Sequence, residues 1–70
     1  MTLSGTLRRQ FFGGVVWVLE RDGEAPVQLD GAIPAHLEGR RVEVKGRPRE
    51  GGMGLAMVGE IWEVQRIRAR

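Results

Sequence analysis

The sequence has no cysteine and no tyrosine, and it contains one histidine, His36, and one serine, Ser4. Without cysteine, a disulfide, a thiolate metal site and a cysteine nucleophile are excluded. Ser4 has no histidine and aspartate at a spacing that suggests a triad, and no second histidine accompanies His36. We therefore expect no enzymatic activity, no cofactor and no metal, and we interpret His36 as a partly buried structural residue.

The chain also has no long hydrophobic run. The longest one, Val15–Leu19, has five residues, whereas about 20 are needed to cross a bilayer. Near the N-terminus the charged pair Arg8–Arg9 follows the first apolar residues, which is the reverse of a secretory signal. We therefore expect a cytoplasmic protein without a membrane partner.

Glycine is abundant instead, with 11 in 70 residues, about twice the average share. Most of the glycines are eight to ten residues apart, and turn signals at that interval predict short strands in a barrel or sandwich. Apolar residues make up 41% of the chain, which is enough for one small core. We predict a single all-β domain over residues 1–70.

Five segments have the composition or alternation of strands. Asp22–Gly23 follows the second of them and is a strong hairpin turn. In the last segment Ile61, Val64 and Ile67 recur every three residues, which a helix would also give, but its β-branched and aromatic residues favour a strand with a bulge. The predicted strands are Thr2–Gln10, Val15–Leu19, Val27–Leu29, Arg41–Arg47 and Ala56–Ile67.

A short helical turn is predicted between the third and fourth strands. Pro34 suits the first turn of a helix, and Gly39 suits the left-handed residue after its end. The segment 30–39 has room for one or two turns and not for a long helix.

Three strands, a helical turn and two more strands resemble the OB-fold, a five-stranded Greek-key barrel. Residues 37–46 read Leu-x-Gly-x-x-Val-x-Val-x-Gly, which is similar to the fourth strand of small bacterial OB-fold domains, and the resemblance covers nearly the whole chain. Valine alternation between glycines also occurs in SH3-like barrels, which are the alternative fold. The resemblance implies a ligand surface on strands two and three, flanked by the loops after strands one and four.

Those two loops and the strands that lead into them contain the candidate binding residues for single-stranded nucleic acid. Phe11 and Phe12 cannot both point into one barrel if the segment is extended, so one of them is free to stack on a base or to cover the barrel end. Arg47 and Arg49 introduce a glycine-rich loop and suit phosphate, although the loop can equally be a solvated connection. The full candidate set is Phe11, Phe12, Arg8, Lys45, Arg47 and Arg49.

The net charge of +2 is low for a nucleic-acid binder, so the placement of the charges matters more than their sum. Arginines gather at strand ends, whereas Glu20, Asp22 and Glu24 lie at the hairpin after the second strand. Such a separation would steer an anionic partner. An ordinary mixed surface is the alternative interpretation.

A second functional hypothesis is self-association or docking on a protein. If Val15, Trp17 and Leu19 point inward, then Val16 and Val18 point outward as an exposed apolar pair. Such a pair is typical of a protein contact or a dimer interface. The opposite register would place Trp17 outside and favour nucleic acid.

Overall fold

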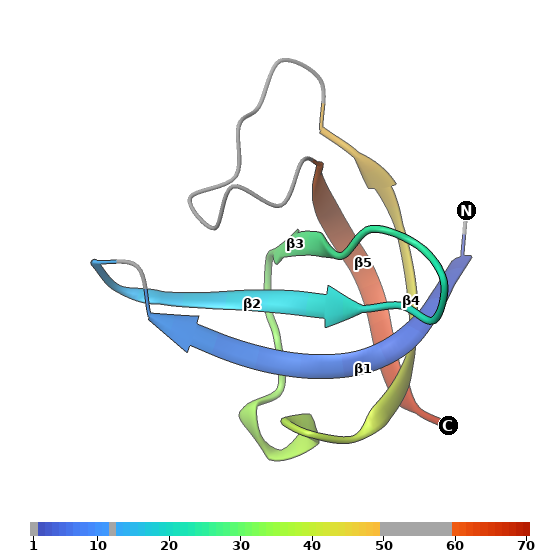
Figure 1. The fold of residues 1–70 in the computed structure, drawn as a ribbon, viewed down its shortest axis with the longest axis horizontal. Coiled ribbons are helices and arrows are strands. Elements are labelled where there is room, and N and C mark those ends of the chain that lie inside the picture. Colours follow the sequence, from blue (N-terminus) through green and yellow to red (C-terminus); the bar gives the residue numbers. More distant parts are fainter. Residues whose placement is uncertain (1, 12, 50–59) are drawn as a thin grey trace.

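The computed structural model describes residues 2–11, 13–49 and 60–70 of the chain. The elements of these residues are β1 Thr2–Phe11, β2 Val15–Glu20, β3 Val27–Asp30, the 3₁₀ turn η1 Ala35–Leu37, β4 Arg41–Pro48 and β5 Ile61–Ala69. In the order β1-β2-β3-β5-β4 the strands close into a barrel, with β3 and β5 parallel and every other pair antiparallel (Figure 1). The predicted all-β barrel with a helical turn between strands three and four is confirmed.

The core is built by the inward faces of all five strands together with η1. Its most deeply buried members include Leu7, Leu19 and Val42, each 0% exposed. Burying one such side chain contributes about 1.5–3 kcal/mol, so eight of them carry much of the stability of a small domain. The cluster consists of Leu7, Leu19, Val27, Leu29, Leu37, Val42, Val44 and Trp62.

The last strand is confirmed as a strand, but its bounds differ from the prediction. It runs from Ile61 to Ala69, while residues 56–59 of the predicted segment lie outside the described residues. Opposite it, Lys45 pairs with Arg66 and the next residue, Gly46, pairs with Val64. Gln65 is therefore the extra residue of a bulge.

The turn η1 is where the sequence predicts it, and Leu37 from it enters the core. Gly39 has φ +79°, the left-handed conformation expected after the turn, and its N–H donates to the carbonyl of Leu7 at 2.6 Å. Two details differ from the prediction: Pro34 stands immediately before the turn instead of inside it, and His36 is exposed, not partly buried. A turn of three residues has too few positions to bury more than one side chain.

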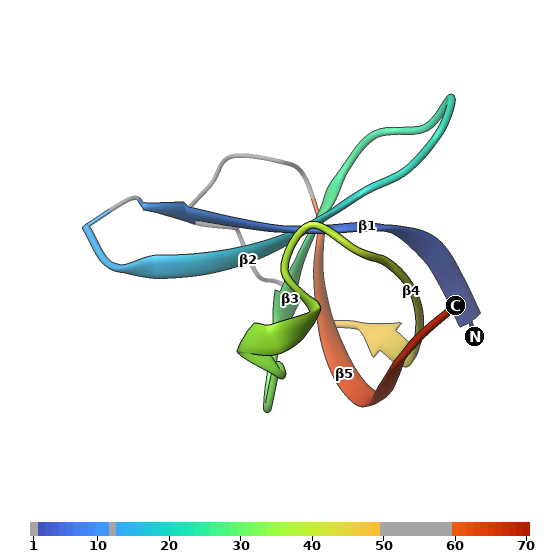
Figure 2. The same ribbon diagram turned by 90° about the horizontal axis from the view of Figure 1, so that it is seen from below.

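The long strand β1 pairs with two different strands along its length. Its first half, Thr2–Thr6, pairs with β4, and its second half, Thr6–Phe11, pairs with β2. Beyond Leu7, β1 therefore has only β2 beside it. Figure 2 shows the resulting two-stranded β1–β2 hairpin running out from the barrel.

Candidate nucleic-acid interface

The end of the projecting hairpin carries two exposed apolar side chains. Phe11 is 70% exposed and Val15 is 53% exposed, and they are cross-strand partners. The backbone N–H and C=O of Leu7 form hydrogen bonds with residues 40 and 39, on the side of β1 away from β2. Backbone polar groups alternate in direction along a strand, so those of Phe11, four residues later, also point away from β2. Phe11 and Val15 thus form a non-hydrogen-bonded pair, the type in which side chains come closest.

Arg9 supports Phe11 from the same face of β1. Its guanidinium carbon is 5.8 Å from the centroid of the Phe11 ring, within the range of a cation–π contact. The same guanidinium forms an ion pair of 3.3 Å with Glu38, which follows η1. The exposed ring of Phe11 therefore has beside it a guanidinium whose position is fixed by its ion pair with Glu38.

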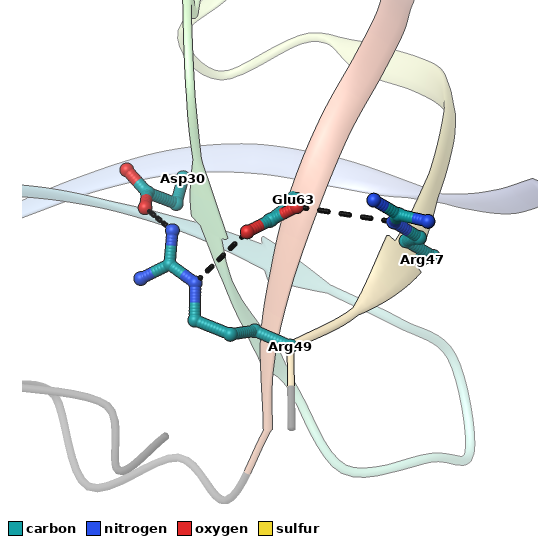
Figure 3. Close-up of polar contacts among 4 residues, drawn as sticks. All are labelled: Asp30, Arg47, Arg49 and Glu63. Atoms are coloured by element: carbon teal, nitrogen blue, oxygen red, sulfur yellow. Dashed lines mark hydrogen bonds and ion pairs between the residues drawn. The ribbon is translucent and has the colours of Figure 1, made fainter. Parts of the chain in front are cut away.

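At the other end of the predicted site, the end of β4 holds a cluster of two arginines and two carboxylates (Figure 3). Arg49 donates to Asp30 through one nitrogen and to Glu63 at 3.2 Å through another. Arg47 lies 3.9 Å from the second oxygen of Glu63. Beside Asp30, a shallow depression of about 270 Å³ is lined by Arg47, Pro48, Arg49 and Glu63.

The two arginines of this cluster are held to different degrees. The hydrogen bonds that Arg49 donates, first to Asp30 and second to Glu63, raise the pKa of Arg49 above its ordinary value, so its charge is fixed and already compensated. Arg47 is 73% exposed, and among the described residues its one ion pair is the 3.9 Å contact with Glu63. Arg47 is therefore the more available cation for an incoming phosphate.

The remaining predicted binding residues do not form one surface. Arg8 is on the outer face of β1 and forms a 2.9 Å ion pair with Glu20. Lys45 is exposed on the outer face of β4, directly opposite Arg66 of β5. Phe12 lies outside the described residues.

The predicted separation of charges is wrong. The arginines at strand ends were expected to lie apart from the carboxylates of the β2–β3 hairpin, but they form ion pairs with them. Arg8 pairs with Glu20, and Arg41 pairs with Asp22. The reason is that β1 and β4 bring their arginines beside the end of β2. Of the eight acidic residues in the described ranges, seven form ion pairs with arginine: Glu20, Asp22, Glu24, Asp30, Glu38, Glu43 and Glu63.

The expected exposed valine pair is also corrected. Trp17 and Leu19 pack against the core, so Val16 and Val18 do occupy the opposite face of β2, but they are only 4% and 1% exposed. A strand that is apolar at every position is typical of burial on both faces, and Val15–Leu19 has that composition. The assembly role of Val16 and Val18 stays a prediction.

Two cations near Lys45 were not among the predicted site residues. Arg66 and Arg68 share the outer face of the barrel with Lys45, and with Thr2 and Glu43 they line a depression of about 210 Å³. The alternation Arg66-x-Arg68 after the bulge was the available signal, but it becomes readable only once Gln65 is recognised as the extra residue.

No protein-family model matches the chain, and neither a curated protein nor a solved structure is significantly similar to it. Within residues 2–11, 13–49 and 60–70 there is no helix with the length and apolar character of a membrane span. The same residues contain no group of three or more histidine, cysteine, aspartate or glutamate side chains placed to hold a metal. The class that fold and site define is thus a small closed β-barrel with an exposed aromatic hairpin.

Proposed function

We propose that the chain is an OB-fold domain that binds single-stranded nucleic acid and is not an enzyme. The strand order and the helical turn between strands three and four support the fold assignment. Phe11 is the stacking platform of the proposed site, and Arg47 is its phosphate contact at the end of β4. Arg49 stays bound to its two carboxylates and shapes the rim.

The exposure of Phe11 carries this proposal. A phenylalanine that is 70% exposed lacks most of the roughly 1.5–3 kcal/mol that burial contributes. Among the other large apolar side chains of the described residues, only Val15, at 53%, is also exposed. A ring on a projecting hairpin, bordered by a guanidinium, has the chemistry used for stacking unpaired bases. Double-stranded nucleic acid, whose bases are already stacked, is the poorer ligand for such a ring.

Replacing Phe11 tests the proposal directly. One stacked base contributes about 1–3 kcal/mol, so Phe11→Ala is expected to weaken binding of a labelled single-stranded oligonucleotide by roughly 5- to 150-fold. Fluorescence anisotropy at low and high salt gives the Kd. Phe11→Trp, which keeps an aromatic face, should bind within a few fold of the unmodified protein.

Val15→Ala is the matched control, because Val15 is the apolar cross-strand partner of Phe11 but has no aromatic face. It should leave the Kd nearly unchanged. If the unmodified protein does not bind the oligonucleotide at low salt, or if the two alanine variants weaken binding equally, stacking on Phe11 is ruled out.

Replacing Glu63 tests the proposal with a variant that should strengthen oligonucleotide binding instead of weakening it. Its carboxylate compensates both Arg47 and Arg49, so Glu63→Gln frees positive charge beside the proposed path of the phosphates. We expect oligonucleotide binding to tighten by about two- to fivefold at low salt, the scale of one exposed ion pair, and the gain to vanish at high salt. Glu24→Gln removes the same charge beside Arg21 at the β2–β3 hairpin, and binding by that variant should stay unchanged.

A protein contact is the second candidate function, and the pairing of Phe11 with Val15 favours placing it at the hairpin end. Two adjacent exposed apolar side chains are a small patch of the kind found at contacts between proteins. Light scattering coupled to size exclusion distinguishes the two functions. A concentration-dependent dimer that Phe11→Ala and Val15→Ala both disrupt would support assembly, and a monomer at all concentrations would contradict it.

A further inference from the structure

The outer face of β4 and β5 contains one pair of side chains that breaks the pattern of its neighbours. Along this antiparallel ladder, Glu43 stands opposite Arg68, and Arg47 stands opposite Glu63. Both are opposite-charge pairs with ion contacts, of 2.9 Å and 3.9 Å. Between them, Lys45 stands opposite Arg66, and like charges directly opposite each other are destabilising.

Neither member of this like-charged pair is compensated within the described part of the chain. Seven of the 11 lysine and arginine side chains have an ion pair there, and Lys45 and Arg66 are among the other four. The nearest carboxylate along the ladder, Glu43, is occupied by Arg68. The pair therefore presents two adjacent positive charges without a counter-charge from the described residues.

The surface around the pair has the room and the donors for a tetrahedral oxyanion. The depression of about 210 Å³ that the pair lines is also lined by Arg68 and by Glu43, whose carboxylate accepts from Arg68. It holds several water molecules at ~30 Å³ each, and so has room for a phosphate. Arg66 offers a planar fork of donors and Lys45 a compact ammonium. Thr2, directly opposite Lys45 on β1, adds a hydroxyl at the edge of the same depression.

We propose that Lys45 and Arg66, with Thr2, form a phosphate-binding site on the outer face of the barrel. A bound phosphate removes the repulsion between the two cations, so the cost of placing them opposite each other is recovered on binding. That the phosphate belongs to a nucleic-acid backbone rests on the function proposed above. Free phosphate and backbone phosphate share this chemistry, and the two arms of the experiment separate them.

Thr2 and Phe11 are the two ends of β1, so this site and the stacking platform are about 30 Å apart if the strand is taken as straight. At about 3.4 Å per stacked nucleotide, and roughly twice that for a fully extended single strand, one strand would need about five to nine nucleotides to contact both. A strand of about 20 nucleotides can therefore reach both sites, and a strand of about three cannot.

The first arm uses inorganic phosphate and needs no nucleic acid. We expect added phosphate to raise the thermal unfolding midpoint of the unmodified protein beyond the effect of chloride at equal ionic strength. Lys45→Gln and Arg66→Gln should abolish that difference, while their midpoints without phosphate should equal or exceed that of the unmodified protein. Arg41→Gln, which loses a cation already paired with Asp22, should keep the phosphate response.

The second arm uses the two oligonucleotide lengths. For the longer strand, Lys45→Gln and Arg66→Gln should each weaken binding by about two- to fivefold at low salt and reduce the slope of log K against log salt by about 0.7, the value of one phosphate contact on a single strand. Arg41→Gln should change the slope little. The shorter strand should bind all three variants alike.

The outcomes separate this site from the function on which it partly rests. A phosphate response that the two variants lose, without oligonucleotide binding by any protein, supports the site and contradicts the nucleic-acid function. Oligonucleotide binding that depends on Phe11 but is equal in Lys45→Gln, Arg66→Gln and Arg41→Gln, without a phosphate response, supports the function and overturns the site.

Discussion

Gly46→Ala is expected to destabilise the barrel by about 2–3 kcal/mol, within the range for overpacking a well-packed core. Gly46 is buried on β4, next to the bulge of β5. A Cβ at this position would overlap the carbonyl oxygen of Glu63 and would lie 3.1 Å from its carbon and 3.3 Å from the Cα of Val64. All three atoms are backbone, so relief requires β5 to move away and the ladder to open.

Chemical denaturation followed by circular dichroism measures this effect, and Gly14→Ala provides the control. Gly14 is exposed between β1 and β2, has no left-handed φ, and a Cβ there would meet no atom within 4 Å. Its substitution should change the free energy of unfolding by less than about 0.5 kcal/mol. Equal denaturation midpoints for the two variants would show that β5 accommodates the methyl group freely.

The expected loss at Gly46 is a large share of the total stability, because a 70-residue domain has a small free energy of unfolding. At 0.05–0.15 kcal/mol per residue, the whole free energy of unfolding is on the order of 4–10 kcal/mol. Gly5 on β1 has the same geometry against the end of β2, where a Cβ would overlap the carbonyl oxygen of Glu20 and lie 3.1 Å from Leu19 Cγ. Two of the glycines that space the strands in the sequence thus also let strands cross closely.

The strand pattern was predictable because alternation and glycine spacing act locally along the chain. The hardest case was the segment with Ile61, Val64 and Ile67, whose spacing of three also suits a helix. The bulge at Gln65 explains the second of these spacings: one extra residue lets Val64 and Ile67 face the core together, although three positions apart would put them on opposite faces of a regular strand. The first spacing has no such cause, because Trp62 and not Ile61 belongs to the core cluster with Val64. A single sequence contains no direct signal for which residue is the extra one.

The surface was less predictable, since it depends on pairing between distant segments. Exposure of an aromatic at the β1–β2 hairpin followed from two adjacent phenylalanines, and Phe11 is indeed exposed. The partners of the arginines could not be predicted, because Arg49, which directly follows β4, contacts Asp30 of β3 and Glu63 of β5. Burial of Val18 on the outer face of β2 needed the continuous apolar run to be interpreted as two buried faces instead of one.

Trp62→Ala should have the largest effect on stability, about 3–5 kcal/mol as for other buried aromatics cut back to alanine. Trp62 is 3% exposed in the core cluster, and its indole Nε1 donates to Glu60 Oε2 at 2.9 Å. The substitution removes the largest side chain of the cluster and leaves a cavity that neighbouring strands of a closed barrel cannot collapse to fill. Such a loss takes most or all of the stability of the domain.

Because Trp62→Ala can unfold the domain outright, Trp62→Phe is the measurable companion. It keeps an aromatic ring but loses part of the volume and the hydrogen bond to Glu60, so we expect a loss of about 1–2 kcal/mol. Phe11→Ala is the matched comparison, since it also cuts an aromatic back to alanine, but at a side chain that is 70% exposed. Its free energy of unfolding should stay within about 0.5 kcal/mol of the unmodified protein, whereas its oligonucleotide binding should fall. If Phe11→Ala destabilised the barrel as much as Trp62→Phe, Phe11 would be a structural residue. That result would contradict its proposed role in binding.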